Sequence, residues 1–566
     1  MTEFVAMNAP SQTASYYGPS GAQYQAVNGV ASIARPDVPG AIAAGWYQNP
    51  PATLANKQLL AKMRASIAAA TNNNPTVNQP WLPPQAVIGG SAGAAVWAAN
   101  TVYPGGTVLT NAAGTHQFLC WIGGTSGATQ PSGMTTPVST TFTSPNPDNY
   151  GTITDNTCAW QWMGPTRTTS ALAGAPAFSV GSLPSQLTQS WPFGPTTPNG
   201  VVYNTFRFTG GSGAAMQYNS PYTAAVLRGV STTAGQGSNL FQGNYVVANL
   251  DAYVEFVTDA PLIAFDTYNN GGYLYGQASQ PPGMAFVIDG RRLWDGNVCC
   301  NVSVANGYVI LDWRNTGGRK FRKIRVSVGG GLQTYAPFWT TPQDTVYFPG
   351  NSQRWSMAFV GDSLWTGQNS GPVVSFQGRA NQVCDLLGCD SHFNASQGST
   401  GMFATNSGAY YNYQQRIQDV INFNPDVVWV QGSINDGITL YLQQQYTTGY
   451  LAYLQSLRAA LPNAMIFLSG VLGTTPSQHT VAEQWMFNAF TQFNDSNSYW
   501  VPCTNDPVAP WWQGTGYITA VQATGNSSIY VGPNDGVHPS WMGIGYLASR
   551  QAEAMKNIIQ TLSLSV

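Results

Sequence analysis

The pattern of short apolar runs and helical stretches after residue 351 most limits how this chain can fold. Apolar runs at 357–360, 427–430 and 466–468 have the length of buried strands. Helical patterns separate and follow them, at 372–387, 409–422, 441–460, 481–494 and 541–561. Strands that alternate with helices form a parallel sheet with helices on both faces. We therefore predict an α/β domain over 351–566, with any ligand at the carboxyl ends of its strands.

The region before this domain has an all-β pattern. Alternation of side chains is visible at 253–257, 308–311 and 324–328, and Gly-rich turns separate these segments. We predict a β-sandwich over 171–350. A basic run from Arg319 to Arg325 lies in this region, and a solvated strand face is favoured over a binding patch for it.

A small aromatic-rich β module is predicted over 85–170. It contains Trp97, Trp160 and Trp162, and its pattern resembles the β modules of chitin-binding type that also occur in phage tail proteins. The resemblance implies carbohydrate binding, or a spacer. The three Trp side chains could form a platform for sugar rings, or one or two of them could be the core of so small a domain. Cys120 and Cys158 could pair or be buried thiols.

The N-terminal part divides into a segment at 1–50 and a helix with a Pro-rich linker at 51–84. The Ala- and Leu-rich stretch 54–70 is predicted to be helical. Segment 1–50 resembles modules of bacteriophage structural proteins, which implies attachment to a virion; an ordinary N-terminal cap is the alternative. No signal peptide and no run of about 18 apolar residues is visible. We therefore expect no membrane insertion, and release on a virus particle is one route to the outside of a cell.

The composition argues against an electrostatic binder. Only 8% of the 566 residues are charged and the net charge is -2, whereas an average protein has roughly 25% charged residues. Nucleic acid is therefore not an expected partner. The 18 Trp, 28 Tyr and 23 Phe suit a polysaccharide partner instead, with other virion proteins as further partners. The sequence has no metal-binding motif, and no metal or cofactor is expected.

A candidate nucleophile follows the first apolar run, in Gly361-Asp362-Ser363. The Gly permits a tight turn that can present the Ser hydroxyl at the carboxyl end of the strand. A neutral Ser needs an adjacent base, and the base needs an orienting group. His538, just before the last helix, could be the base, and Asp535, three residues upstream, could orient it. Taken alone, each of these motifs could equally well be an ordinary turn.

Two segments between this Ser and His could donate hydrogen bonds to an oxyanion. Segment 394–401 offers the backbone N–H of Gly398 or Gly401. The spacing does not decide between these two glycines, although we prefer Gly398. Segment 431–436 follows the strand 426–430 and offers the side-chain amide of Asn435.

Together the four motifs resemble the SGNH (GDSL-type) hydrolase family in kind and order, over residues 355–560. The resemblance implies a three-layer α/β fold with a flavodoxin-like parallel sheet, and hydrolysis of acyl esters without a metal. It implies Ser363 as nucleophile, His538 as base and Asp535 as its orienting residue. It also implies an oxyanion hole made of the Ser363 N–H, the Gly398 N–H and the Asn435 amide. One departure is Ser433, because the family usually has Gly two residues before this Asn.

These features predict a serine esterase that removes an acyl group, acetyl in the first place, from a polysaccharide. The upstream β modules would hold the polymer near Ser363 and raise the local concentration of its esters. Combined with the N-terminal segment, this predicts a virion-associated deacetylase that acts on a bacterial capsule or O-antigen. The alternatives are a non-catalytic phage receptor-binding or tail protein and a bacterial plant-cell-wall acetyl esterase.

Overall fold

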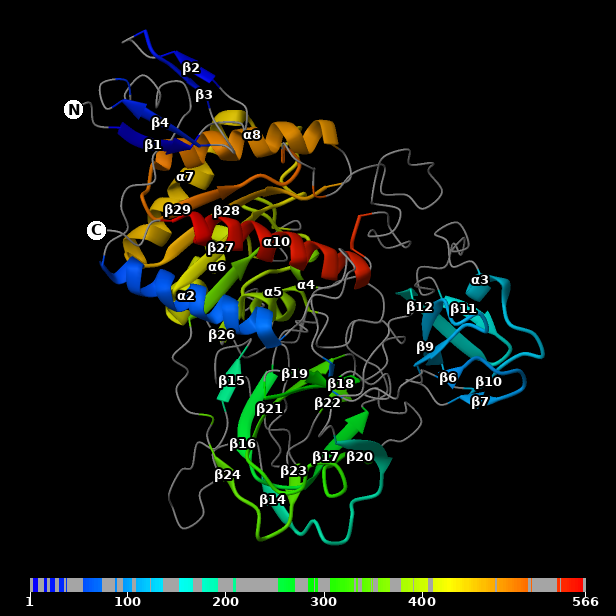
Figure 1. The fold of residues 1–566 in the computed structure, drawn as a ribbon. Helices are drawn as coiled ribbons and strands as arrows, with labels where there is room; N and C mark the ends of the chain where they lie inside the picture. The colour runs from blue at the N-terminus through cyan, green and yellow to red at the C-terminus, as the bar shows by residue number, and fades with distance from the viewer. Residues whose placement is uncertain are drawn as a thin grey trace.

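The computed structural model shows an α/β body, two antiparallel sheets and a small separate β unit (Figure 1). The residues that it describes are 4–8, 15–17, 21–25, 30–34, 37, 54–73, 87–88, 95–103, 108–122, 124–135, 152–165, 176–191, 207–209, 253–269, 283–289, 291–293, 306–329, 332–333, 338–347, 349, 355–366, 378–389, 391–405, 411–473, 476–506, 511, 537–539 and 541–562. Among these residues, none of the helices is both long and apolar enough to cross a membrane.

The predicted parallel sheet is present in the C-terminal part of the chain. It has five strands in the order β26-β25-β27-β28-β29, and all four pairings are parallel. In this order the strands are β26 (Ser391–Asn394), β25 (Ser356–Val360), β27 (Val427–Gly432), β28 (Met465–Val471) and β29 (Ser498–Val501). The order along the chain reverses at β25, which places the switch point between β25 and β27. Ligands of open α/β sheets bind beside such a point, at the carboxyl ends of the strands.

Helices cover both faces of this sheet and enclose two separate cores (Figure 1). One layer holds α2 (Leu54–Asn73), α5 (Arg379–Leu387) and α10 (Trp541–Thr561), and the other holds α6 (Tyr413–Phe423), α7 (Gln443–Ala460) and α8 (Pro476–Phe493). Alternate residues of β27 serve the two cores, because successive side chains of a strand point to opposite faces. Val427 and Trp429 face the first layer, and Val428 and Val430 face the second.

Helix α2 packs against α5 and α10, although it precedes them by more than 300 residues in the sequence. Its buried residues Leu60 and Met63 belong to the same core as the last helix. The Arg64 guanidinium donates to the carbonyl of Ile559 at 2.8 Å, near the end of α10. A cation at this position meets carbonyl groups that have no partner within the helix. The helix predicted at 54–70 is therefore confirmed, and in space it is a part of the α/β body.

Residues between 177 and 347 form two sheets in which they pair antiparallel, and residues 87–88 join one of these sheets in parallel. One sheet contains β13 (Ala177–Gly181), β20 (Asn306–Asp312), β17 (Leu262–Asn269), β23 (Phe338–Thr340) and β14 (Gln189–Trp191), with β22 (Leu332–Gln333) beside β17. The other contains β15 (Arg207–Thr209), β16 (Tyr253–Thr258), β21 (Arg322–Gly329), β18 (Gly283–Ile288), β19 (Arg291–Leu293) and β5 (Val87–Ile88), with β24 (Val346–Tyr347) beside β16. Aromatic rings join the two sheets: Phe256 stacks on Phe338 at 4.5 Å, and Phe265 packs on Phe286 at 5.1 Å.

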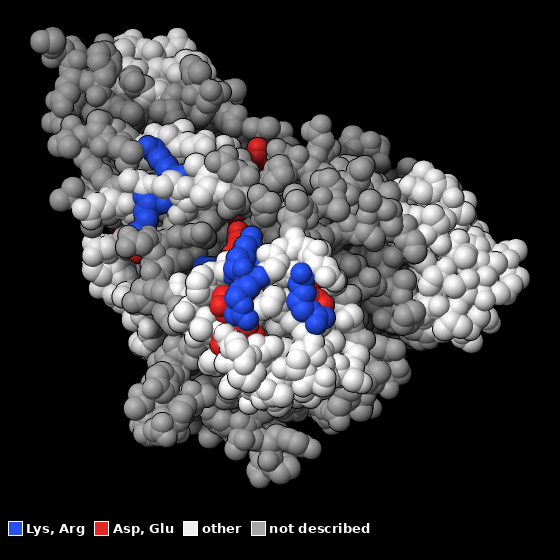
Figure 2. All heavy atoms as spheres, turned by 60° about the horizontal axis from the view of Figure 1, so that its bottom comes forward, with Lys and Arg blue, Asp and Glu red and all other residues white. Residues whose placement is uncertain are grey.

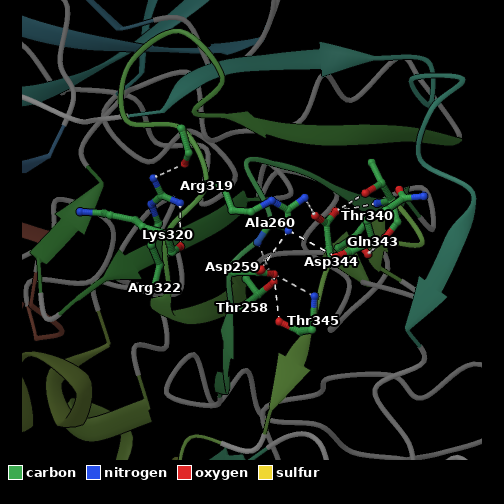
Figure 3. A network of polar contacts seen from close by, with 12 residues as sticks. Thr258, Asp259, Ala260, Arg319, Lys320, Arg322, Thr340, Gln343, Asp344 and Thr345 are labelled. Atoms are coloured by element: carbon green, nitrogen blue, oxygen red, sulfur yellow. Dashed lines mark hydrogen bonds and ion pairs between the residues drawn. The ribbon is translucent and has the colours of Figure 1, made fainter.

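Three cations of the basic run, Arg319, Lys323 and Arg325, pair with carboxylates, so the run is only in part the solvated strand face that its sequence suggests. Figure 2 shows Lys and Arg side chains beside Asp and Glu side chains on this face. Arg319 pairs with Asp259 at 2.9 Å and with Asp344 at 2.5 Å (Figure 3). Arg322 is 1% exposed and lies over the Trp313 ring.

An ion pair joins the second of these sheets to the α/β body. Arg325 of β21 donates to Asp385 of α5 at 2.6 Å, and its other side contacts Glu255 of β16 at 3.4 Å. The side chains of Arg325 and Asp385 are only 10% and 17% exposed, so their contact is shielded from solvent. The two parts of the chain therefore share a specific polar contact.

The aromatic-rich module forms its own sheet, in the order β11-β12-β9-β8-β6. Its strands are β6 (Ala95–Val96), β8 (Val108–Thr110), β9 (His116–Ile122), β11 (Thr152–Asp155) and β12 (Cys158–Pro165); β7 (Val102–Tyr103) pairs with β10 (Gly124–Thr125), and α3 is Ser132–Thr135. Cys120 and Cys158 are buried thiols that form no disulfide; their side chains contact each other, and burial raises the pKa of Cys120.

Near the N-terminus, two antiparallel strand pairs are described. They are β1 (Phe4–Asn8) with β4 (Val30–Ala34), and β2 (Ser15–Tyr17) with β3 (Gln23–Gln25). Tyr24 donates its hydroxyl hydrogen to Asp37 at 2.7 Å. The remainder of the predicted segment 1–50, including 41–46, lies outside the described residues.

Candidate active site

The turn after β25 places Ser363 at the carboxyl end of the central strand. Ser363 is the first residue of the short helix α4 (Ser363–Thr366) and is 4% exposed. The Trp365 ring packs over Gly361, where an added Cβ would lie 2.1 Å from a ring carbon. Only glycine therefore fits between the strand and the Trp365 ring.

The Asp362 carboxylate lies under this turn and connects it to the loop that follows β27. It accepts hydrogen bonds from the Leu364 N–H at 3.0 Å, the Ser433 hydroxyl at 2.9 Å and the Ile434 N–H at 3.1 Å. Burial raises the pKa of Asp362, while these donors and the charge of His538 lower it. The Gly361-Asp362-Ser363 motif and the segment 431–436 therefore meet at the Asp362 carboxylate.

The loop after β26 runs alongside the same turn. The Ala395 N–H donates to the Phe359 carbonyl at 2.8 Å, and the Gln397 N–H donates to the Gly361 carbonyl at 3.3 Å. Ser399 has a left-handed backbone with φ of 57°. These contacts place the buried Gly398 close to the turn that carries Ser363.

The two glycines that sequence spacing could not separate have different surroundings. The Gly401 N–H donates to the Ala404 carbonyl at 3.1 Å, and an added Cβ on Gly401 would lie 2.3 Å from a carboxylate oxygen of Asp436. Gly401 therefore has a packing role, and its N–H is engaged. No acceptor for the Gly398 N–H is found among the described residues.

Asn435 is fixed by the same loop. Its side-chain amide donates to the Thr400 carbonyl at 2.9 Å, and its backbone N–H donates to the Ser433 hydroxyl at 3.0 Å. The same amide nitrogen also lies 3.4 Å from the Ser433 hydroxyl oxygen, a longer contact than its hydrogen bond to Thr400. The structure thus brings Ser363, Gly398 and Asn435 into neighbouring loops at one end of the sheet.

His538 lies in the short segment before α10 and is partly buried. The charged form of His538 lowers the pKa of Asp362, the residue next to Ser363. Asp535 lies outside the described residues, and its predicted role stays a prediction.

Two buried arginines brace the turn, and sequence reasoning missed both. Arg416 of α6 donates to the Gly361 carbonyl at 3.3 Å and to the Thr400 hydroxyl at 3.1 Å. Arg379 of α5 lies 4.0 Å over the Trp365 ring and donates to Gln431 at 3.3 Å, and burial lowers its pKa to about 9. Arg416 holds a position in the buried stripe of its helix, between Tyr413 and Val420. A cation in such a stripe, in a chain with so few charges, is a signal that could have found it.

The predicted sugar platform needs correction at Trp160. This ring is fully buried and packs edge-on against Tyr103 at 5.1 Å. The Nε1–H groups of Trp160 and Trp97 both donate to one oxygen of the buried Asp155, each at 2.8 Å. Trp160 is therefore part of the core of the module, and its ring is not available to a sugar. Trp97 is partly buried, and the Trp162 side chain lies outside the described residues.

Comparison with known proteins identifies the class of the C-terminal domain. Residues 359–543 match the GDSL-like Lipase/Acylhydrolase family, and this part of the chain is a GDSL-like acylhydrolase domain. The class comprises hydrolases of carboxylic esters. A comparison with curated proteins gives no match.

Several solved structures resemble the chain at low sequence identity. A family two carbohydrate esterase from Clostridium thermocellum, solved with cellohexaose, is 15% identical with a TM-score of 0.41, over 63% of this chain and 99% of that chain. The salicylyl-acyltransferase SsfX3 from a tetracycline biosynthetic pathway is 12% identical with a TM-score of 0.46, over 65% of this chain and 98% of that chain. An acetyl xylan esterase from Butyrivibrio proteoclasticus is 12% identical with a TM-score of 0.37, over 68% of this chain and 99% of that chain.

Proposed function

We propose that this protein is a serine esterase that removes acyl groups, acetyl in the first place, from a polysaccharide. The observation that carries the proposal is the position of Ser363. It begins a turn at the carboxyl end of β25, beside the loops of Gly398 and Asn435. A nucleophile, a base and hydrogen-bond donors for the oxyanion are what acyl transfer requires.

The proposed reaction has two steps. His538 takes the proton of the Ser363 hydroxyl as its oxygen attacks the ester carbonyl, and Asp535 orients His538. The N–H groups of Ser363 and Gly398 and the amide of Asn435 bind the oxyanion of the tetrahedral intermediate. The alcohol leaves with the proton from His538, which gives acyl-Ser363. Water then attacks this ester, again with His538 as base, and releases the acid.

The proposal of a polysaccharide substrate is based on the domains that precede the hydrolase domain. We infer that the facing sheets act as a β-sandwich that is fixed to the α/β body through Arg325 and Asp385, and can hold a polymer beside the site. In the aromatic-rich module, Trp97 and Trp162 are the predicted sugar contacts that we retain. Attachment to a virion through segment 1–50, and action on a bacterial capsule or O-antigen, are the finer parts of the proposal.

The test is acetate release from O-acetylated bacterial surface polysaccharide by the wild type and by Ser363→Ala. Release by the wild type alone is the expected result. If neither protein releases acetate but the wild type hydrolyses p-nitrophenyl acetate, the esterase assignment stands and the polysaccharide substrate is wrong. Inactivity of the wild type on both substrates would overturn the proposed function.

A further inference from the structure

The Ser433 hydroxyl is a meeting point of three loops around Ser363. The side chain is 1% exposed. Its oxygen lies 2.9 Å from the Asp362 carboxylate, 2.9 Å from the Thr400 carbonyl and 3.0 Å from the Asn435 N–H. These three partners come from the segments after β25, β26 and β27, respectively.

We propose that Ser433 is a positioning residue, whose hydroxyl holds the Asn435 amide in place for the oxyanion of the acyl-transfer reaction. This inference rests on the proposed function. It concerns a residue that differs from the family pattern, in which a Gly without any hydroxyl usually stands at this place.

The position of Ser433 is a consequence of the packing of its neighbour Gly432. An added Cβ on Gly432 would lie 2.6 Å from the sulfur of Met486 in α8 and 2.8 Å from a methyl group of Val471. The glycine is therefore required at 432, where the strand meets the helix layer. Position 433 comes one residue later, at the carboxyl end of the strand, where its hydroxyl donates to Asp362 at 2.9 Å.

The hydroxyl fixes both ends of the Asn435 residue. Its lone pairs accept the Asn435 backbone N–H, and its single hydrogen can go to Asp362 or to Thr400. The Thr400 carbonyl in turn accepts the Asn435 side-chain amide at 2.9 Å. Without the hydroxyl, the Asn435 N–H and the Asp362 carboxylate each lose a buried partner.

The expected kinetic effect follows from where the oxyanion exists. Negative charge on the carbonyl oxygen develops only in the transition state, so a displaced Asn435 amide lowers kcat and leaves KM nearly unchanged. Loss of hydrogen bonds to a charged group lowers a rate about 10- to 100-fold. A residue with a purely structural role would lower thermal stability without this selective loss of kcat.

Ser356 offers a matched control at the opposite end of the same sheet. Its hydroxyl donates to the Asp426 carboxylate at 3.1 Å and accepts the Asp426 N–H at 3.1 Å. It therefore repeats the contacts of Ser433 with a carboxylate and a backbone N–H, away from the carboxyl ends of the strands.

The experiment compares hydrolysis of p-nitrophenyl acetate by the wild type, Ser433→Ala, Ser433→Gly and Ser356→Ala, with thermal melting of each. We expect kcat to fall about 10- to 100-fold in both Ser433 variants at nearly constant KM, and to stay near the wild-type value in Ser356→Ala. The inference is overturned if folded Ser433 variants keep wild-type kcat, or if Ser356→Ala loses as much. An inactive wild type would overturn the proposed function as well, and is thereby distinguished from failure of the Ser433 role alone.

Discussion

The Asp436 carboxylate accepts the Met402 backbone N–H at 2.6 Å, and through this bond the loop after β27 holds the loop after β26. The same carboxylate also accepts the N–H groups of Phe403 at 3.0 Å and Ala404 at 2.9 Å. Because Asp436 directly follows Asn435, it sets the distance between the two loops that supply the proposed oxyanion donors.

We expect Asp436→Asn to lower both stability and activity. The amide keeps one acceptor oxygen, but its NH2 group faces backbone N–H groups that then have no acceptor. These unsatisfied buried donors lower the free energy of unfolding by about 2–3 kcal/mol. The displaced loops should lower kcat on p-nitrophenyl acetate by about 10-fold or more. Asp426→Asn is the control, since its carboxylate accepts the Ser356 N–H at 2.7 Å at the amino end of the sheet. Equal loss of kcat in both variants would speak against a local role of Asp436.

His538 should be the histidine on which turnover depends. We expect His538→Ala to lower kcat by roughly 10^4 to 10^6, because the general base and the proton donor to the leaving group are lost together. His479→Gln should leave kcat nearly unchanged, since His479 lies on α8 and packs on Gly473. Steady-state kinetics of the two variants checks this, and comparable losses would remove His538 from the mechanism.

Trp160 should stabilise the aromatic-rich module and have no part in catalysis. Replacing this buried ring with Ala leaves a large cavity and frees Asp155 of one donor, which costs about 3–5 kcal/mol. We expect faster proteolysis within 85–170 and unchanged hydrolysis of a small nitrophenyl ester. Wild-type resistance to protease in Trp160→Ala would show that the ring does not hold the core together.

Glu483 should make the stability of the hydrolase domain depend on pH. Its carboxylate is fully buried on α8 and accepts four backbone N–H groups, those of Val471, Cys503, Thr504 and Asn505. Burial raises its pKa to about 7, from an ordinary value of 4.5, although the four donors lower it. The folded state thus binds the proton more tightly than the unfolded state. Protonation of Glu483 therefore contributes to the free energy of unfolding. This contribution is complete below pH 4.5 and is lost as the pH rises through 7.

The measurement is urea unfolding of the wild type and of Glu483→Gln between about pH 4.5 and about pH 7.5. The variant cannot titrate at this position. The free energy of unfolding of the wild type should therefore fall relative to that of the variant, by about 3 kcal/mol over this range. A difference that stays constant with pH would contradict the raised pKa.

Three of the five strands of the central sheet could be predicted from the sequence. The runs that became β25, β27 and β28 are apolar and lie between helices on both sides, so their pattern was sufficient. The strands β26 and β29 were missed. They are four residues long and form the edges of the sheet, and Ser-His-Phe-Asn in β26 has no strand-like pattern of its own.

The remaining features depend on contacts between residues that are distant in sequence, which local sequence patterns do not reveal. The helix predicted at 54–70 is present, but its partners α5 and α10 are distant in sequence. Periodicity shows that one face of a helix is buried without showing what covers it. Trp160 illustrates the same limit, because an aromatic residue in a small β unit suits a core and a sugar site equally well. The hydrogen bond from the Gly401 N–H to the Ala404 carbonyl, which distinguishes Gly401 from Gly398, is likewise not encoded by spacing.

The most direct test of the account is covalent capture of Ser363. A fluorophosphonate reacts with an activated serine hydroxyl, and tandem mass spectrometry locates the modified residue. We predict that the wild type gains one probe, that the probe is on Ser363, and that Ser363→Ala neither gains it nor hydrolyses p-nitrophenyl acetate. A Ser363→Ala protein that still reacts with the probe and hydrolyses the ester would contradict the assignment of Ser363 as the nucleophile.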